Sequence, residues 1–581
     1  MGGIYLLRDH EDGSAHPSQG AIQRRYRAQG FDDGVVLDLD GWRGRHFEFA
    51  VGGPEGLYHH GTDLIAVAGT LAYDGQMGRA ALAALLADAA PPSLDWSRLA
   101  GQFVALVRKA GRSFLFTDYF AAFQLFRSAD GRVVSTSLLG MLDAVPHVRF
   151  DRQGLYEYAF NIAPIGDRTV FADITMLGPG TMLELVPGGS ILHPLVKPLP
   201  GAIVVESLAD RIERHRHHLA AVIAPHLDWF GDHVRCALSG GLDSRLVLAA
   251  LRAGGCRPTT YVYGPPHSAD VRASTAIGAT LGFPVEHIDK SEHPLDSDTF
   301  PAEVTRAFHQ LDGLPNFGNI FDGGANVAAM AARHADGVLA ASGGCGEVYR
   351  DFFFLRDRPL TPAVLASTFF ARFTARDATA LFDPRQFLDA IADEIAAGLG
   401  VSRTDKVPRV LIEQAYPRIR CRALFGREIS TEARYSAYLM PFLDHQLVAD
   451  AVGLPLVLKQ AGAFEGMLLN AISPELARLP SAYGHHFAEP PSRAHRRAEW
   501  STRIRPTWLR RHSYALQRRL RPVVDDHGHL PAPDLMSMVL DPDMPIMRRY
   551  FALDQVADGG LLRRIACLEY LAEQLGSQLK S

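Results

Sequence analysis

The sequence is poor in cysteine and has no arrangement of cysteine and histidine that would build a metal site or a disulfide framework. Five cysteines occur in 581 residues, and they are scattered along the chain: Cys236, Cys256, Cys345, Cys421 and Cys567. No close Cys-Cys or Cys-His pair has the spacing of a zinc site. An odd number of scattered cysteines is typical of proteins in a reducing compartment, so we expect a cytoplasmic protein.

The chain also lacks long hydrophobic runs and a strong charge of one sign. No window of about 18 apolar residues occurs, and the apolar run after Met1 ends within a few residues, so we expect neither a membrane span nor export. The net charge of −5 argues against bulk binding of nucleic acid. With 47% hydrophobic and 21% charged residues, the chain is expected to form roughly two to four globular domains.

What the sequence does contain is a serine and glycine loop between a predicted strand and a predicted helix. The apolar stretch Val234–Leu238 predicts a buried strand, and apolar residues recur with helical spacing from Leu242. The loop reads Ser239-Gly240-Gly241-Leu242-Asp243-Ser244. Glycines allow close approach of an anion, N–H groups at a helix start attract it, and hydroxyls add donors. The loop therefore predicts a phosphate site, where the Asp243 carboxylate would share a Mg²⁺ with the phosphate.

No lysine follows these glycines, so the loop differs from the type that ends in Lys-Ser or Lys-Thr. It resembles the pyrophosphatase loop of enzymes that release AMP and pyrophosphate after adenylating a carboxylate or a similar oxygen. The alternative interpretation is an ordinary glycine-rich turn. The resemblance implies that ATP is bound by Leu238, Ser239, Gly240, Gly241, Asp243 and Ser244.

The first half of the chain reads as a β-rich domain with some helix. Strands are predicted at 64–71, 103–108, 114–118 and 132–137, and a helix at 79–88. This half resembles the N-terminal glutaminase-like domain of asparagine synthetases through the stretches 99–104, 117–126, 166–174 and 177–180. The resemblance implies an α+β domain of the glutaminase-like β-sandwich type over 1–195. A proline-rich linker near 194–202 then leads to an ATP-pyrophosphatase synthetase domain over 203–581.

The departure from that family is at residue 2. Glutamine-hydrolysing relatives need a thiol there, freed by removal of Met1, because the new N-terminal amine acts as its base. This sequence has Gly2, and no cysteine precedes Cys236. We therefore predict that the domain cannot make ammonia from glutamine by that route and is structural.

In the second half, predicted strands at 256–264, 285–288 and 338–341 alternate with helices at 206–226 and 268–276. This alternation predicts a doubly wound parallel sheet, an α/β fold whose ligands lie at the carboxyl ends of the strands. Tyr263 and Gly264 end one of these strands and are counted among the predicted nucleotide-binding residues.

A second glycine loop, Ser342-Gly343-Gly344-Cys345-Gly346-Glu347, follows the strand at 338–341. The resembled family carries Ser-Gly-Glu-Gly-Ser-Asp-Glu at this position, which implies that Ser342 and Gly343 line ATP and that Glu347 joins Asp243 on the Mg²⁺. Both acids are then predicted to be catalytic, since they stabilise departing pyrophosphate. Glutamate has a longer arm than aspartate, so Asp351 stays open as an alternative ligand. A glycine turn with a solvated Glu347 is the other interpretation.

The helical C-terminal third contains three further features. Met440–His445 matches a Pro-Phe-Leu-Asp-His element of the family, and we favour a structural role for Asp444 and His445. Leu479–Phe487 occupies the place where relatives carry a catalytic lysine, and no lysine is present. His485 is predicted to replace its charge or its proton transfer, the alternative being a surface histidine.

Ten arginines and a single acid, Glu499, lie between residues 493 and 521, interleaved with Trp500, Trp508 and Tyr514. This helical region is interpreted either as a site for an acidic peptide or partner protein, or as a solvated or acid-paired surface. The arginines are Arg493, Arg496, Arg497, Arg503, Arg505, Arg510, Arg511, Arg518, Arg519 and Arg521.

Without an ammonia source, the amine that attacks must already be on the substrate, which points to ring closure within one molecule. β-Lactam synthetases and lasso peptide cyclases are the two branches that do this, and the arginine-rich region and the missing lysine favour the lasso cyclase. It would use ATP and Mg²⁺ to join a precursor core peptide's N-terminal amine to its own Asp or Glu side chain. A leader-peptide-processing protease or a recognition protein is a further expected partner. A β-lactam synthetase-like enzyme, an ammonia-using ligase and a non-catalytic scaffold stay open.

Overall fold

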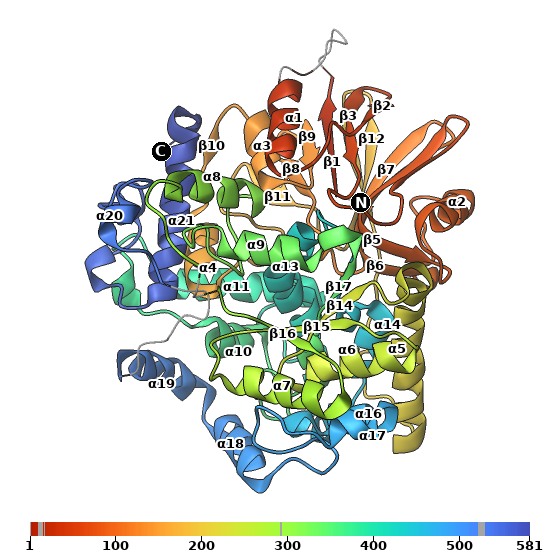
Figure 1. Ribbon diagram of the computed structural model, residues 1–581. Coiled ribbons are helices and arrows are strands. Elements are labelled where there is room, and N and C mark those ends of the chain that lie inside the picture. The colour runs from red at the N-terminus through yellow and green to blue at the C-terminus, as the bar shows by residue number, and fades with distance from the viewer. Residues whose placement is uncertain (1, 10–15, 17, 291–292, 521–528, 581) are drawn as a thin grey trace.

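The computed structural model describes residues 2–9, 16, 18–290, 293–520 and 529–580. Its N-terminal part contains two antiparallel sheets of six strands each. The first has the order β11(Ile174–Met176), β8(Phe126–Ser128), β9(Val133–Ser135), β1(Gly3–Arg8), β3(Trp42–Phe47), β2(Val35–Leu39). The second has the order β13(Gly189–Pro194), β12(Thr181–Val186), β7(Arg112–Thr117), β6(Leu99–Lys109), β5(Asp63–Tyr73), β4(Leu57–His60). Figure 1 shows these strands at the upper right of the molecule.

The two sheets pack face to face. The His46 ring in β3 is fully buried, and its Nε2 lies 2.9 Å from the carbonyl oxygen of Val67 in β5, which joins one sheet to the other. Burial lowers the pKa of His46 to about 4, so the ring is neutral. The Tyr26 ring stacks on Phe47 with centroids 4.4 Å apart, and Trp42 is completely buried. The predicted sandwich of this half is confirmed.

The second half contains a five-stranded sheet in which every strand pair is parallel. Its order is β16(Val285–Ile288), β15(Thr259–Tyr263), β14(Val234–Ala237), β17(Leu339–Ala341), β18(Tyr438–Leu439). The chain passes from β14 through α6(Leu242–Ala253) to β15 and through α7(Ala269–Leu281) to β16, then returns to the other side of β14. The strand order therefore reverses between β14 and β17, and ligands of such sheets bind at this switch point. The predicted α/β fold class is confirmed.

Most predicted elements occur with shifted ends. The strands at 64–71, 103–108 and 114–118 belong to the longer β5, β6 and β7, and the helix at 79–88 is α2(Gly78–Asp88). The strand predicted at 132–137 is shorter, because Ser137 caps the helix α3(Leu138–Ala144): its side chain accepts a hydrogen bond from Gly140 N. The helix predicted at 206–226 is α5(Leu208–Phe230), capped by Ser207.

The chain ends beside its N-terminal half. Residues 195–207 form neither helix nor strand, and the division into domains at 1–195 and 203–581 stays a prediction. The helix α21(Gly559–Leu575) packs on α4(Arg152–Asn161), and the short strand β19(Leu579–Lys580) pairs in parallel with β10(Val148–Arg149). The last described residues therefore pack against the N-terminal half of the chain, which the sequence did not predict.

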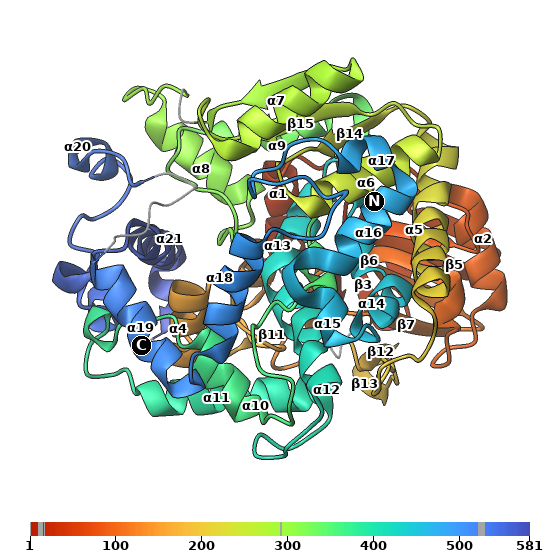
Figure 2. The same cartoon turned by 90° about the horizontal axis from the view of Figure 1, so that it is seen from below.

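The remaining α-helices are spread over the whole molecule (Figures 1 and 2). They are α1(Gln19–Ala28), α8(Phe300–Gln310), α9(Ala325–Arg333), α10(Pro362–Leu365), α11(Pro384–Leu399), α12(Arg409–Glu413), α13(Arg422–Glu432), α14(His445–Val452), α15(Leu456–Lys459), α16(Ala463–Ile472), α17(Pro474–Ala477), α18(Arg493–Ile504), α19(Thr507–Leu520) and α20(Pro533–Met536). Within the described ranges, no single helix has the length and apolar character to cross a membrane; one pair bent by 112°, His445–Val452 with Leu456–Ile472, meets those two criteria jointly.

A buried aspartate holds the two halves together. Asp312 has no exposed surface, and its Oδ2 lies 3.0 Å from both Arg427 Nη1 and Arg434 Nη2. Ser137 Oγ and the N–H of Leu138, both from the N-terminal half, donate to the same carboxylate. Burial raises the pKa of Asp312, but the attraction of Arg434 and Arg427 outweighs it and leaves that pKa lowered.

We expect Asp312→Ala to destabilise the fold by about 3–5 kcal/mol, because it leaves two buried guanidinium groups without their anion. Since the folded pKa is depressed, this contribution is present above the unfolded pKa and is lost as the pH falls through the folded value. Urea unfolding of both proteins at neutral and acid pH should show the difference shrinking in acid. Asp33→Ala, which breaks an exposed pair with Arg27, should change little at either pH. Equal effects of the two substitutions would contradict the prediction.

Candidate functional site

The first glycine loop lies at the carboxyl end of the central strand β14, as predicted. Ser244 Oγ accepts a hydrogen bond from Ser239 N at 2.9 Å and lies 3.0 Å from Ser239 Oγ, so the loop folds tightly over the start of α6. The N-cap of α6 is Gly241, which has no side chain to occupy the N–H groups of the first turn. A helix start with open N–H groups and two nearby hydroxyls suits a phosphate.

The second glycine loop packs directly on the first. A Cβ atom at Gly343 would lie 2.6 Å from Ser244 N, and one at Gly346 would lie 2.1 Å from Asp243 Oδ1. A side chain at Gly343 would force the two backbones apart, and one at Gly346 would displace the Asp243 side chain, so glycine is needed at both positions. Ser342 Oγ accepts from Gly344 N at 3.1 Å and braces the turn. The structure thus packs the Ser342–Gly346 loop against Asp243 and Ser244.

Asp243 belongs to a charge network that the sequence did not predict. Its Oδ1 lies 2.5 Å from Arg350 Nη2, and Arg350 Nε lies 3.0 Å from Glu465 Oε2. Glu465 is completely buried, and its Oε1 has no hydrogen-bond partner among the described residues. Burial raises the pKa of Glu465 well above its usual range; Arg350 opposes the shift and Asp243 adds to it. The only sequence signal was a lone acid in the apolar stretch Ala463–Ile472.

The two acids considered as second metal ligands differ in their surroundings. Glu347 lines a cavity beside the loop, where its Oε2 accepts a hydrogen bond from Tyr416 OH at 2.6 Å. Asp351 is 2% exposed, and its two oxygens are ion-paired with Arg409 at 2.7 Å and Arg503 at 2.6 Å. A carboxylate held by two arginines is not available to a metal ion, which argues against Asp351.

The donor set fits Mg²⁺ in company with phosphate. Asp243 is ion-paired with Arg350, and the charge of Glu347 acts on the same guanidinium. Mg²⁺ in nucleotide sites is held by one or two carboxylates together with phosphate oxygens. In the described part of the chain, no group of three or more His, Cys, Asp or Glu side chains could hold a metal by itself. The cation that Asp243 binds here is Arg350, so a metal ion would compete with that guanidinium.

We therefore expect Arg350→Gln to lower the Mg²⁺ concentration needed for half-maximal pyrophosphate release by a few-fold. Glu465 would tolerate the loss of its partner, because its raised pKa favours the neutral carboxyl. Mn²⁺ binding followed by electron paramagnetic resonance should show the same tightening without turnover. Arg356→Gln, which removes an arginine that bonds the Ile504 carbonyl, is the control. An unchanged or higher metal requirement in Arg350→Gln would refute the competition.

Residues 479–487, where the resembled asparagine synthetases carry a lysine, pack on the first glycine loop. Arg245 in α6 is fully buried and donates to the carbonyl oxygens of Leu479, at 3.0 Å, and Pro480. Ala482 N then donates to Gly240 O at 3.0 Å. The neighbouring Tyr483 places its hydroxyl 3.4 Å from Arg350 Nη1 and lines the cavity.

His485 does not line the cavity as its neighbour Tyr483 does. The cavity wall here is made by Tyr483 and His495, whose rings stack with centroids 5.6 Å apart. The His485 Nδ1 lies 3.2 Å from Tyr483 O, and its ring packs near Phe487. Burial lowers the pKa of His485 and also that of His495. The predicted catalytic role of His485 stays a prediction, and His495 is the histidine that faces the cavity.

The structure also shows where the predicted nucleotide-binding pair Tyr263–Gly264 and the predicted structural pair Asp444–His445 lie. The Tyr263 side chain lines a separate cavity of about 250 Å³ with Lys290, so the structure does not bring it to the wall beside Glu347. Gly264 follows it at the carboxyl end of β15. The structural role predicted for Asp444 is confirmed, because its carboxylate caps α14 by accepting from Gln446 N and Leu447 N; His445 stacks on Tyr119.

The arginine-rich region forms α18 and α19, at the lower left in Figure 1. Arg503 is acid-paired with Asp351 and Glu499, whereas Arg505 and Arg510 line the cavity. Trp500 and Trp508 are 56% and 69% exposed. Arg521 lies outside the described residues, as do the side chains of Arg511, Tyr514, Arg518 and Arg519.

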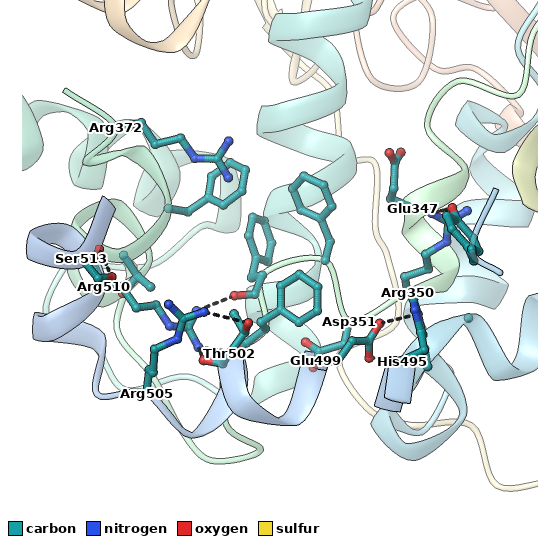
Figure 3. Close-up of a pocket in the computed structure, with 18 of the residues that line it drawn as sticks. Glu347, Arg350, Asp351, Arg372, His495, Glu499, Thr502, Arg505, Arg510 and Ser513 are labelled. Atoms are coloured by element: carbon teal, nitrogen blue, oxygen red, sulfur yellow. Dashed lines mark hydrogen bonds and ion pairs between the residues drawn. The ribbon is translucent and has the colours of Figure 1, made fainter. Parts of the chain in front are cut away.

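The cavity beside the two loops has a volume of about 580 Å³. Leu242, Glu347 and Arg350 form one end, and the rings of Phe352, Phe353 and Phe369 form much of its wall. Figure 3 shows Glu347 and Arg350 at the right of this space. Binding sites for small organic ligands are commonly of about 300–1,000 Å³. A substrate in this cavity would therefore reach the edge of the predicted phosphate site.

No family model matches the sequence, and no curated protein matches it either. Among solved structures, the fold has a likeness to glutamine phosphoribosylpyrophosphate amidotransferase from B. subtilis complexed with ADP and GMP, at 10% identity and a TM-score of 0.24, over 49% of this chain and 90% of that one. A second likeness is to a structure described as the allosteric regulatory enzyme of purine biosynthesis, at 12% identity and a TM-score of 0.23, over 50% of this chain and 82% of that one. Scores this low carry no argument about fold or function.

Proposed function

We propose that this protein is an ATP-dependent, AMP-forming amide ligase of the asparagine synthetase type that closes a ring within one substrate. The observation that carries the proposal is the pair of glycine loops at the switch point of the parallel sheet. Gly343 and Gly346 approach Ser244 and Asp243 so closely that no side chain fits between them. The Ser239–Ser244 loop thereby meets a second loop ending in Glu347 at the mouth of a cavity.

Each group of the site has a role in that reaction. The open N–H groups of the first turn of α6 and the hydroxyls of Ser239 and Ser244 would bind the phosphates that leave as pyrophosphate. Asp243 and Glu347 would hold Mg²⁺, whose charge offsets that of the leaving group. Arg350 would give up Asp243 to the metal ion and remain paired with the buried Glu465.

The proposed chemistry has two displacements. An oxygen of the substrate carboxylate attacks the α-phosphorus of ATP, and the bond to pyrophosphate breaks. The substrate's own amine then attacks the acyl carbon, AMP leaves with the bonding electrons, and the amine gives up a proton as the amide forms. Holding amine and acyl group together in one cavity can lower the barrier by about 7–11 kcal/mol when the geometry is right.

The finer proposal is a lasso peptide cyclase. The carboxylate would belong to an Asp or Glu side chain of a precursor core peptide, and the amine would be that peptide's N-terminus. The cavity of about 580 Å³ with phenylalanine walls supports a peptide segment, and the absence of a lysine in 479–487 supports a substrate that brings its own amine. A processing protease or recognition protein is the proposed partner. A β-lactam synthetase-like or an ammonia-using ligase is the alternative, because its phosphate site would be identical.

Exchange of labelled pyrophosphate into ATP tests the proposal, because it reports reversible adenylation alone. With a candidate peptide we expect exchange and a cyclic product; with the same peptide acetylated at its N-terminus we expect exchange without a ring. A ring formed despite acetylation would identify another nucleophile. Failure of exchange with carboxylate substrates of both kinds, peptides and small amino acids, would favour a non-catalytic scaffold and overturn the proposal.

The N-terminal domain should contribute no ammonia. A Cβ atom at Gly2 would lie 2.1 Å from the Phe31 ring and 2.8 Å from Glu48 O, so a thiol side chain has no room there. We expect neither the native protein nor Gly2→Cys to form glutamate from glutamine. Gly2→Cys should also melt at a lower temperature than Gly20→Cys, since Gly20 has only the flexible tip of Arg24 nearby. Glutamate formation by either protein would refute this prediction.

A further inference from the structure

The end of the cavity away from the glycine loops is lined by arginines. Figure 3 shows Arg372, Arg505 and Arg510 at the left, across the space from Glu347 and Arg350. Arg505 directly follows the last residue of α18, Arg510 lies in α19, and both belong to the arginine-rich region of the sequence. Arg372 comes from a distant part of the chain, two residues after the π-helical segment η5(Ala366–Phe370). The fold therefore brings a third arginine to two from the arginine-rich region, which sequence spacing alone did not show.

Arg510 is fixed in place and keeps one donor unused. It donates to the carbonyl oxygens of Phe353, at 3.0 Å, of Thr502, at 2.8 Å, and of Phe354. Its Nε is buried and has no hydrogen-bond partner among the described residues. Phe354 has a φ of 49°, in the left-handed region that a bulky side chain disfavours. Arg510 thus holds a strained turn on the cavity wall.

Two of these arginines, Arg505 and Arg510, are not paired with the acids nearby. Across the described ranges, neither Arg505 nor Arg510 forms an ion pair with a carboxylate; Arg505 donates only to Thr502 Oγ1, at 2.8 Å. Asp351 is already taken by Arg409 and Arg503. Burial, together with repulsion from Arg505, lowers the pKa of Arg510. Two like charges held together without an anion favour the arrival of one.

An aromatic surface lies beside these arginines. The Phe369 ring is 5.1 Å from the ring of Phe352 and 5.2 Å from that of Phe353, centroid to centroid. The Arg372 guanidinium lies over Phe369 at 4.4 Å, an arrangement that fixes its plane at the cavity wall. A ligand at this end therefore meets a flat apolar surface and guanidinium groups together.

We infer that this end of the cavity binds a second carboxylate of the substrate, carried beside an aromatic or apolar group and separate from the carboxylate that is adenylated. The inference rests on the proposed function for the identity of the first carboxylate. Guanidinium groups recognise carboxylates through two parallel hydrogen bonds, which compact ammonium groups cannot make. In a peptide, this second carboxylate would be either another acidic side chain or the free C-terminus.

A binding experiment without turnover tests the subsite. The probes are synthetic hexapeptides containing one Phe and one Glu, in three forms: with an added second Glu and an amidated C-terminus, with a free C-terminus and no second Glu, and with neither. The proteins are the full chain, the double variant Arg372→Gln/Arg505→Gln, and the control Arg496→Gln. Arg496 is an exposed residue of the same α18 and does not line the cavity. Affinities are measured by isothermal titration calorimetry with Mg²⁺ and a non-hydrolysable ATP analogue.

We expect at least one dicarboxylate form to bind the full chain about tenfold more tightly than the monocarboxylate form, a difference of about 1.4 kcal/mol. The double variant should lose this preference and Arg496→Gln should keep it; which form is preferred identifies the source of the carboxylate. Equal binding of all forms, a preference that survives in the double variant, or an equal loss in the control would overturn the inference. Pyrophosphate exchange with the same peptides tests the ligase proposal separately. Exchange without a preference for dicarboxylate peptides would support the ligase and overturn the subsite. A preference without exchange would support the subsite and contradict the ligase.

Discussion

Asp243→Asn is expected to abolish pyrophosphate release, with a loss of at least about 10³-fold, which corresponds to about 4 kcal/mol of transition-state stabilisation. The substitution removes a charge and almost no volume. The asparagine oxygen can still accept from Arg350, so the loop should keep its conformation. What is lost is the anionic oxygen that would hold Mg²⁺ against the leaving phosphates. Release of pyrophosphate at saturating substrate and metal measures the effect.

The comparison with Arg350→Gln separates two explanations of that loss. If Asp243 acted only by anchoring the guanidinium, both substitutions would have the same effect. If Asp243 holds the metal, Asp243→Asn inactivates while Arg350→Gln stays active at a lower Mg²⁺ concentration. Unfolding midpoints of both variants should remain near that of the native chain. An Asp243→Asn variant that turns over at the native rate would disprove the metal assignment.

Gly343→Ala is the second substitution with a large expected effect. The new methyl group would lie 2.6 Å from Ser244 N and 2.8 Å from Asp243 C, both backbone atoms that cannot rotate away. The two glycine loops must separate, and a displacement of about 1 Å in a phosphate site can cost about 10²-fold in rate. We expect a loss of pyrophosphate release of at least that size, together with a lowered melting temperature.

The adjacent residue offers a matched control. A methyl group at Gly344 would meet two side chains and no backbone: Met440, 2.7 Å from its terminal carbon, which can adopt another rotamer, and the Phe425 ring at 3.2 Å, which must shift by a few tenths of an ångström. Gly344→Ala should therefore retain most of the activity. Two equally active variants would mean that the close approach of the loops is not needed for the reaction, and two equally inactive ones would mean that the loop tolerates no added volume at all.

The sequence was informative wherever a function depends on a continuous stretch. A buried strand, two glycines and a helix start define the Ser239–Ser244 loop within a few residues, and the structure places it at the carboxyl end of β14. The alternation of strands and helices likewise predicted the parallel sheet, because a helix between two strands carries the chain back to the end of the sheet where the previous strand began. Asp444 was predicted to be structural, as one of a buried pair that braces helices, and the structure shows that its carboxylate caps α14.

The network around Asp243 could not be read from the sequence. Arg350 and Glu465 lie 107 and 222 residues along the chain from Asp243, counted from the residue numbers, and nothing local to either signals the other. They meet because α16 packs on α6, which buries an acid beside an arginine. Asp351 was open as a metal ligand for the same reason: only the folded chain shows Arg409 and Arg503 on its oxygens.

By itself, the sequence determined the α/β fold class, the place of the Ser239–Ser244 loop between a strand and a helix, and the absence of a thiol at residue 2, because each depends on residues adjacent in the chain. The tertiary structure alone decided which cation Asp243 binds, which histidine faces the cavity and which arginines of α18 and α19 line it. The physical reason is that ion pairs and cavity walls form between side chains brought together by packing. Their partners are selected by burial and distance in space, and spacing along the chain records neither.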